Sequence, residues 1–226
     1  MIFEKNLPGE LPPQQGAITW PSSFYEWAKP NSYQESTLTI QELWKKVGYF
    51  LPLKGDDLLA KQAKDWLAGR TNQLIPIVVH LKNSRSQPQS NANLEAWFTF
   101  FAECEKFPVK FFLIGNDPLN HPVTDFRNVV YLQNYGLKFE CELALISQAR
   151  LFMGMSSGPC NAALFSNIPF LIWKHPDHHA EIMKKEFGEM GHFPFAQSGQ
   201  RFFQEWDSFS NIRNAFLPFA EKLFAL

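Results

Sequence analysis

Residues Leu151 to Trp173 read LFMGMSSGPCNAALFSNIPFLIW, and this stretch decides between a membrane helix and a buried sheet. None of its residues is charged, and it is long enough to span a bilayer at about 1.5 Å per residue. However, the Ser-Ser-Gly-Pro interruption and a second break at Ser166 to Pro169 would leave backbone groups unsatisfied in lipid. We therefore predict a strand, a turn, a short helix and a second strand, in a protein that does not span a membrane.

The same alternation extends toward the N-terminus. Ile75 to Leu81 (IPIVVHL) is a continuous, mostly β-branched apolar run, as expected for a strand that is covered on both faces. Further strands are predicted at 109–114, 128–132, 151–154 and 169–173, and helices at about 93–105, with Asn91 or Asn93 as the cap, 139–149 and 159–165. Strands that alternate with helices predict an α/β fold with a doubly wound, Rossmann-like parallel sheet.

The sequence predicts that the chain has two parts, an N-terminal extension and a domain that contains the sheet. Residues 1–70 form an N-terminal extension, irregular to about Pro52 and then containing an amphipathic helix that follows Asp56-Asp57 and stops near Gly69. Residues 71–226 hold the sheet and a C-terminal tail, His178 to Leu226, that we expect to be mostly helical.

Composition excludes several classes of protein. The 226 residues include 21 basic and 22 acidic side chains without a block of either sign, so nucleic acid is disfavoured as the main partner. The three cysteines are odd in number and widely spaced, which favours buried thiols in a reducing compartment. Met1 to Pro13 lacks the apolar run of a signal peptide, so we expect a cytoplasmic location. Most of the 23 phenylalanines are expected in the core.

The first candidate site is the loop Gly154-Met155-Ser156-Ser157-Gly158-Pro159, between a predicted strand and a predicted helix. Ligands of open α/β sheets bind beyond the carboxyl ends of the strands, where a helix N-terminus offers free N–H groups to an anion. Ser156 and Ser157 add hydroxyl groups, and Gly154 and Gly158 permit close approach, so the loop is typical of a diphosphate cradle. A Gly/Ser loop that merely starts a helix is the alternative.

The second candidate site is the exit of the first strand, His80-Leu81-Lys82-Asn83-Ser84-Arg85. His80 and Lys82 point to the same side of an extended chain, and Arg85 can turn back toward the same crevice. Lys as a point charge and Arg as a fork would neutralise a phosphate, with Asn83 and the strand-exit Gly115 nearby. A solvated basic loop is the alternative.

Three other groups have simpler interpretations. His175, His178 and His179 lack partners at metal-ligand spacing, so we expect a loop at the ligand edge and no metal site. Glu140 and Glu142 begin a helix and suit its positive end, and Cys160 is expected to be a buried structural thiol.

The segments IPIVVHLKNS, VKFFLIGND and ELALISQARLFMGMSSGPCNAALFSNIPFLIW together resemble the nucleotide-sugar-binding half of a GT-B glycosyltransferase, in its fucosyltransferase-like or heptosyltransferase-like branch. The resemblance covers about residues 75–173. It implies that Lys82 and Arg85 contact the donor diphosphate and that Ser156, Ser157 and Gly158 cradle it, with His175 near the sugar. The fucosyltransferase-like branch has His-x-Arg where this chain has His80-x-Lys82, so a point charge replaces a bidentate fork.

The resemblance also implies a nucleotide-sugar donor, a glycan or lipid-linked acceptor, and metal-independent inverting transfer without a further cofactor. The chain contains no Asp-x-Asp sequence, which agrees with that chemistry. Residues 1–70 are too few for a second sheet domain, so either a second lobe or partner chain completes the enzyme, or the chain is a reduced homologue. A non-catalytic nucleotide- or glycan-binding module and a sugar-nucleotide epimerase of similar fold stay open as alternatives.

Overall fold

The computed structural model describes residues 32–49, 56–119, 126–187 and 192–224. The chain divides into two compact units, residues 1–49 and 50–226. In the first unit the described element is helix α2 (Ser32–Val47), which the irregular sequence pattern did not predict. The remainder of the predicted extension up to residue 31 lies outside the described residues.

The second unit contains a parallel sheet with the order β3-β2-β1-β4-β5-β6. Its strands are β1 (Ile75–His80), β2 (Val109–Ile114), β3 (Val129–Tyr131), β4 (Leu151–Met155), β5 (Phe170–Lys174) and β6 (Gln200–Gln204). Every neighbouring pair is parallel, and the chain winds outward from β1 in both directions. The predicted doubly wound α/β sheet is therefore confirmed.

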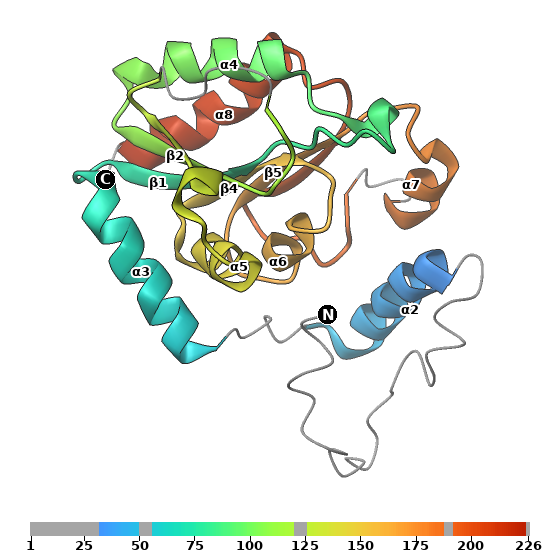
Figure 1. The fold of residues 1–226 in the computed structure, drawn as a ribbon. Coiled ribbons are helices and arrows are strands. Elements are labelled where there is room, and N and C mark those ends of the chain that lie inside the picture. Colours follow the sequence, from blue (N-terminus) through green and yellow to red (C-terminus); the bar gives the residue numbers. More distant parts are fainter. Residues whose placement is uncertain (1–31, 50–55, 120–125, 188–191, 225–226) are drawn as a thin grey trace. The chain divides into compact units, whose positions relative to one another are not determined.

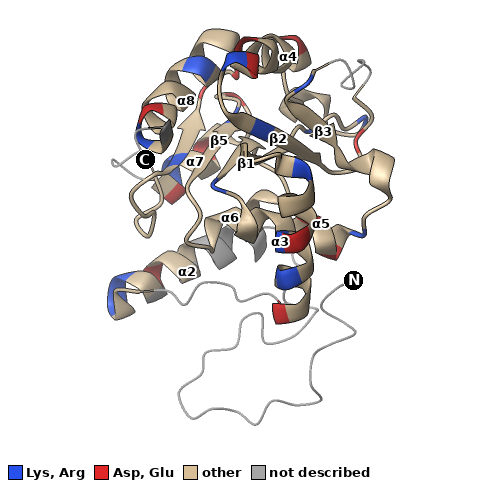
Figure 2. Ribbon diagram, turned by 90° about the vertical axis from the view of Figure 1, so that its left-hand side faces the viewer, with Lys and Arg blue, Asp and Glu red and all other residues tan. Residues whose placement is uncertain are grey.

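Helices cover both faces of this sheet (Figure 1). Helices α4 (Leu94–Glu103) and α8 (Phe209–Phe224) pack on one face, and α3 (Asp57–Thr71), α5 (Phe139–Gln148) and α6 (Cys160–Leu164) pack on the other. Because side chains alternate along a strand, Ile77 and Val79 join the core under α4 and α8, while Val78 joins the core under α3 and α5. Basic and acidic residues are interspersed along α3 (Figure 2).

Two helix starts follow directly from capping residues. Asp56 accepts hydrogen bonds from the N–H groups of Leu58 and Leu59, at 2.8 and 3.0 Å, and so begins α3. Asn93 accepts from the N–H of Ala96 at 3.2 Å and begins α4, as one of the two predicted caps.

The C-terminal end of α3 differs from the prediction. The helix continues through Gly69 and ends at Asn72, which adopts the left-handed conformation with φ 48°. Helix α3, assigned to the N-terminal extension from the sequence pattern, packs against β1 and α5 within the unit that holds the sheet.

Phenylalanine forms much of the core, as predicted. The ring of Phe111 on β2 lies 4.9 Å from that of Phe101 and 5.7 Å from that of Phe100, both on α4. Phe216 on α8 lies 5.2 Å from Phe100, and all four residues are buried. Close aromatic packing thus joins the sheet to α4 and α8.

The prediction of a mostly helical tail was wrong in one part. The tail contains α7 (Ala180–Phe187) and α8, but Gln200–Gln204 forms the edge strand β6 between them. Only two apolar residues, Phe202 and Phe203, lie in this strand between polar neighbours, so it lacks the buried-strand pattern of β1. Within the described ranges, no helix is both long enough and apolar enough to cross a membrane.

Candidate functional site

The two loops singled out in the sequence meet at the point where the sheet changes winding direction. The chain leaves β1 toward β2 and leaves β4 toward β5, on opposite sides, although β1 and β4 are neighbours. His80, the last residue of β1, pairs in register with Gly154 on β4. A crevice at such a switch point is the usual ligand site of an open parallel sheet. The structure therefore brings the two predicted loops together.

A direct contact joins these loops. The Nδ1 atom of His80 lies 2.8 Å from the hydroxyl oxygen of Ser157, and that hydroxyl donates to the carbonyl of Met155 at 3.1 Å. Both contacts are satisfied when the Nδ1–H group of His80 donates to the Ser157 oxygen. Burial lowers the pKa of His80 to about 4, Asp117 opposes this shift, and Lys82 adds to it. The ring is therefore neutral at neutral pH, with Nε2 left as an acceptor.

Two glycines allow the backbone to pack tightly around His80. Gly154 has φ +141°, and a Cβ atom there would collide with the carbonyl oxygen of His80. Gly115 has φ +99°, and its Cβ atom would lie 2.8 Å from the His80 ring. Residues other than glycine rarely adopt such φ values. Both predicted site glycines thus hold His80 in place.

The Ser156 to Gly158 loop offers fewer free donors than the sequence implied. The N–H of Ser156 bonds to the carbonyl of Trp173 at 2.7 Å, and the N–H of Ser157 contacts the Cys160 sulfur at 3.4 Å. Helix α6 has only five residues, so its dipole is small. Gly158 is exposed, and a ligand can approach its backbone.

Cys160 behaves as a structural thiol. Its side chain is buried behind the Ser157 loop, and this burial raises its pKa to about 11. The thiol is therefore protonated and unreactive at neutral pH, as the sequence analysis expected.

Lys82 and Asn83 have different roles. The ammonium group of Lys82 donates to the side chain of Gln87 at 2.6 Å, and burial lowers the pKa of Lys82. The backbone N–H of Asn83 donates to the carboxylate of Asp117 at 2.8 Å, and its side-chain amide donates to the carbonyl of Pro118. Asn83 therefore ties the loop after β1 to the loop after β2.

Arg85 lies farther along the loop that follows β1, and its side chain is exposed. The structure places it near the rim rather than in the contact between the two loops. Contact with a bound anion would require the Arg85 side chain to turn inward.

Lys174 lies at the candidate site and was not predicted there from the sequence. It is the last residue of β5, and only 8% of its surface is exposed. Burial lowers its pKa, opposed by Glu186. The register pairs Met155 with Trp173, so Lys174 follows the strand beside the Ser156 loop. A lysine that ends the apolar run FLIWK at the carboxyl edge was the available signal.

Two histidines, His178 and His179, lie within the electrostatic influence of Lys174. Burial lowers the pKa of His178 to about 4, and the positive charges of His179, Lys174 and Lys82 add to this shift. The pKa of His179 is lowered by burial, Lys174 and Lys82. These shifts show that Lys174 and Lys82 create a positive field beside the two histidines, on the β5 side of the switch point. Within the described parts of the chain, no group of three or more His, Cys, Asp and Glu side chains is arranged to hold a metal ion.

Glu142 corrects a second expectation. The sequence analysis assigned it to capping the helix that it begins, but only 2% of its surface is exposed and its Oε2 atom accepts from the N–H of Gly115 at 3.0 Å. Burial raises its pKa, and the Gly115 bond opposes this shift. Glu142 therefore connects α5 to the turn after β2, beside His80.

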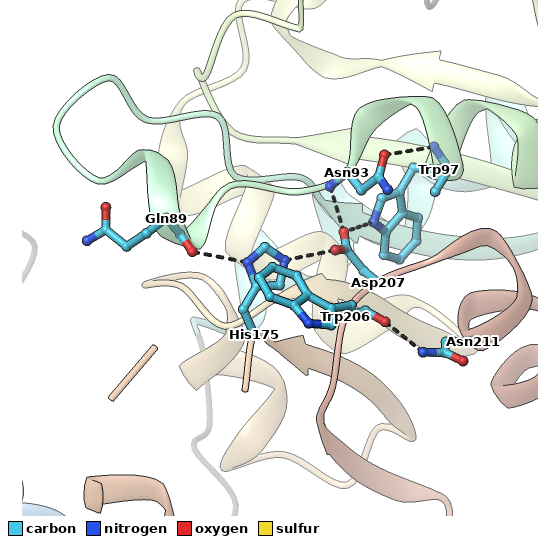
Figure 3. A network of polar contacts seen from close by, with 8 residues as sticks. Gln89, Asn93, Trp97, His175, Trp206, Asp207 and Asn211 are labelled. Atoms are coloured by element: carbon cyan, nitrogen blue, oxygen red, sulfur yellow. Dashed lines mark hydrogen bonds and ion pairs between the residues drawn. The ribbon is translucent and has the colours of Figure 1, made fainter. Parts of the chain in front are cut away.

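His175 lies in a buried polar network rather than in the crevice (Figure 3). Its Nδ1 atom lies 3.0 Å from the carbonyl of Gln89, and its Nε2 atom lies 2.9 Å from the carboxylate of Asp207. Both partners are acceptors, so a ring that satisfies both donates from both nitrogens and forms an ion pair with Asp207. Trp206 covers the ring, with centroids 4.4 Å apart.

Asp207 connects this network to α4. Its second carboxylate oxygen accepts from the indole N–H of Trp97 and the backbone N–H of Asn93, both at 2.8 Å. Only 1% of Asp207 is exposed. Because both nitrogens of His175 are occupied, the predicted contact of His175 with a sugar would require these bonds to break.

No family model matches the chain, and no curated protein matches it. Among solved structures, the glycosyl transferase family 9 protein from Veillonella parvula is similar, with 12% identity and a TM-score of 0.52, over 76% of this chain and 54% of that one. Two structures of Escherichia coli heptosyltransferase WaaC are also similar. The complex with ADP-2-deoxy-2-fluoro heptose has 15% identity and a TM-score of 0.47, over 79% of this chain and 52% of that one. The complex with ADP has 14% identity and a TM-score of 0.47, over 79% of this chain and 53% of that one.

The chain thus spans about half the length of the structures that it matches. At these identities the likeness concerns the fold, and it agrees with the strand order and with the layers of helices. The chain has the Rossmann-like fold of a GT-B glycosyltransferase domain.

Proposed function

We propose that this chain is a glycosyltransferase-type protein that binds a nucleotide diphosphate sugar at the carboxyl edge of the sheet. The observation that carries the proposal is the His80–Ser157 contact, which joins the two predicted loops at the switch point. The fold shared with a family 9 glycosyl transferase supports it. In this proposal the diphosphate lies against Ser157 and Gly158, and the sugar is transferred to a glycan or lipid-linked acceptor.

The positive field beside this loop supports a diphosphate ligand. Lys82 and Lys174 each carry a pKa lowered by burial, so both charges are partly desolvated. A bound diphosphate would pair with these two lysine charges, and the attraction between opposite charges is stronger in a site of low dielectric. The same two lysines would offset the charge of the leaving nucleotide diphosphate, so we propose transfer that needs no metal ion. Inversion at the sugar is part of this proposal on the resemblance to GT-B transferases alone.

A second candidate function is a non-catalytic nucleotide- or glycan-binding module. One observation favours it: the chain spans 54% of the family 9 glycosyl transferase, so a second lobe or partner chain would be needed to build a two-lobed enzyme. Incubation of the chain with nucleotide sugars separates the two functions. Slow donor hydrolysis or transfer supports the enzyme, and binding without turnover supports the module.

Isothermal titration with UDP, GDP and ADP tests nucleotide binding directly. We expect saturable binding of at least one nucleotide. The Ser157→Trp variant should bind it at least about tenfold more weakly, because the indole removes the hydroxyl that contacts His80 and obstructs the loop. The matched control is Ser147→Trp, at an exposed position on α5. If the folded chain binds none of the three nucleotides, or if Ser157→Trp retains full affinity, the proposed site is wrong.

Lys174 provides a second test, directed at the phosphate groups. We expect Lys174→Gln to weaken binding of the diphosphate by about tenfold, since a charge-assisted hydrogen bond contributes about 1.5–3 kcal/mol. Binding of the corresponding nucleoside should not change. Lys184→Gln, on the exposed surface of α7, is the control. An equal loss for nucleoside and diphosphate would assign Lys174 to structure rather than to phosphate binding.

A further inference from the structure

A cavity of about 570 Å³ lies at the other edge of the sheet, away from the candidate site. Its lining includes Arg150, Pro169 and Gly199, which directly precede the first residues of β4, β5 and β6. The C-terminal half of α8 forms the facing wall. Because the strands are parallel, all three of these positions lie at the amino edge, opposite to His80 and Ser157.

The charge of this cavity is positive. Arg150, Arg201 and Lys222 line it, and no acidic residue is among the described residues of the lining. Lys222 lies in the last turn of α8, where a cation also offsets the helix dipole. Arg150 and Arg201 have no such role, and both are exposed. Neither forms an ion pair with any carboxylate in the described ranges.

One wall of the cavity is apolar. Leu171 is 3% exposed and pairs in register with Arg201, so the two side chains lie on the same face of the sheet. Pro218 and Phe219 on α8 line the cavity opposite them. An arginine fork therefore lies directly beside an apolar surface. A ligand with a charged end and an apolar body would contact both.

We propose that this cavity binds a phosphate monoester that carries an apolar group. A phosphate monoester is close to a dianion at neutral pH, which suits two arginines without carboxylate partners, and the planar guanidinium matches phosphate geometry. The apolar group would cover Leu171 and Phe219. The volume of about 570 Å³ falls within the range of small-molecule pockets, roughly 300–1,000 Å³. The ligand is a free phosphate monoester or the headgroup of an anionic lipid.

Isothermal titration of the full chain with phenyl phosphate, inorganic phosphate and phenol tests both parts of the ligand. We expect phenyl phosphate to bind at least about tenfold more tightly than either of the other probes. Arg150→Gln and Arg201→Gln should each weaken this binding by about tenfold, the loss expected for a charge-assisted bond. Lys64→Gln, on exposed α3, is the matched control and should bind as the parent chain does.

Co-sedimentation with vesicles distinguishes the two sources of the phosphate. If the chain sediments with vesicles that contain phosphatidate but not with vesicles of pure phosphatidylcholine, and if Arg201→Gln abolishes this sedimentation, the ligand is a lipid headgroup. If the chain binds phenyl phosphate in the titration but sediments with neither kind of vesicle, the ligand is a free phosphate monoester.

Three results would overturn the proposal. The first is that phenyl phosphate does not bind at millimolar concentration. The second is that inorganic phosphate binds as tightly as phenyl phosphate. The third is that neither Arg150→Gln nor Arg201→Gln changes the affinity for phenyl phosphate. Ser157→Trp serves as an independent check, because it should abolish nucleotide binding without changing phenyl phosphate binding. If it abolishes phenyl phosphate binding instead, the phosphate is bound at the carboxyl edge and the cavity is not its site.

Discussion

His80 and His175 both lie at the carboxyl edge of the same parallel sheet, yet their surroundings differ. His80 ends β1, contacts one hydroxyl group through Nδ1 and lies against two glycines. His175 follows β5 and has an acceptor at each ring nitrogen, one of them the buried carboxylate of Asp207. Both rings are similarly buried, with exposed fractions of 6% and 7%.

The difference shows that position at a ligand edge does not by itself place a side chain in a ligand site. Both ring nitrogens of His175 are used to join the end of β5 to the loop that holds Gln89 and to the segment that holds Asp207, so this ring has a structural role. His80 keeps Nε2 available when Nδ1 donates to Ser157, so this ring can still accept a bond. The hydrogen-bond inventory, rather than burial, separates the two residues.

The largest effect is expected from removal of Asp207. Asp207→Ala leaves the donors of His175 and Trp97 buried without their acceptor, and we expect a loss of about 3–5 kcal/mol in the free energy of unfolding. Urea denaturation measures this loss. Asp65→Ala, at an exposed position on α3, should cost less than about 0.5 kcal/mol. Equal losses in the two variants would contradict a structural role for the His175 network.

The pH dependence of stability tests the His80 side of the comparison. The pKa of folded His80, about 4, lies below its ordinary value of 6.5, so the unfolded chain binds the proton more readily between these values. The stability contributed by neutral His80 is therefore complete above pH 6.5 and is lost as the pH falls toward 4. We expect this loss to amount to about 3 kcal/mol.

Urea denaturation at several pH values between about 7.5 and 3.5, a range that includes both the ordinary and the folded pKa of His80, provides the measurement. His80→Gln is the matched variant, because glutamine can hydrogen-bond to Ser157 but does not titrate. The parent chain should lose more stability than the variant on acidification. Parallel curves for the two proteins would mean that His80 titrates normally in the folded state.

The positions of most strands and helices were predictable because they depend on local patterns. The apolar run 75–81 and the cap at Asn93 each determine an element from a few neighbouring residues. Adjacency of the loops after β1 and β4 follows from the winding of a parallel sheet. Strand β6 was missed because an edge strand with two apolar residues has no buried-strand pattern.

The side-chain roles were less predictable because they depend on contacts between residues far apart in the sequence. The partners Gly115 of Glu142 and Asp207 of His175 lie 27 and 32 residues away. No spacing rule connects such pairs, so both residues were assigned roles from their local position alone. Lys174 was missed because its proximity to Lys82 arises only when β5 pairs with β4 and β4 pairs with β1.

The smallest expected effect concerns Trp97 on α4 and Trp173 on β5, whose rings pack against each other. Trp97 and Trp173 are both fully buried, with ring centroids 5.5 Å apart. The indole N–H of Trp97 donates to Asp207, whereas that of Trp173 has no hydrogen-bond partner among the described residues. Replacing either by phenylalanine removes a similar apolar area, but only Trp97→Phe leaves a buried carboxylate with a missing donor.

We therefore expect Trp97→Phe to reduce the free energy of unfolding by about 2 kcal/mol more than Trp173→Phe. Urea denaturation of the two variants gives this difference directly, and the shared loss of ring volume cancels. The double variant Trp97→Phe with Asp207→Ala should show less than the sum of the single losses, because the two residues share one bond. Strict additivity would mean that the indole bond to Asp207 contributes nothing, and that Trp97 stabilises this region through ring packing alone.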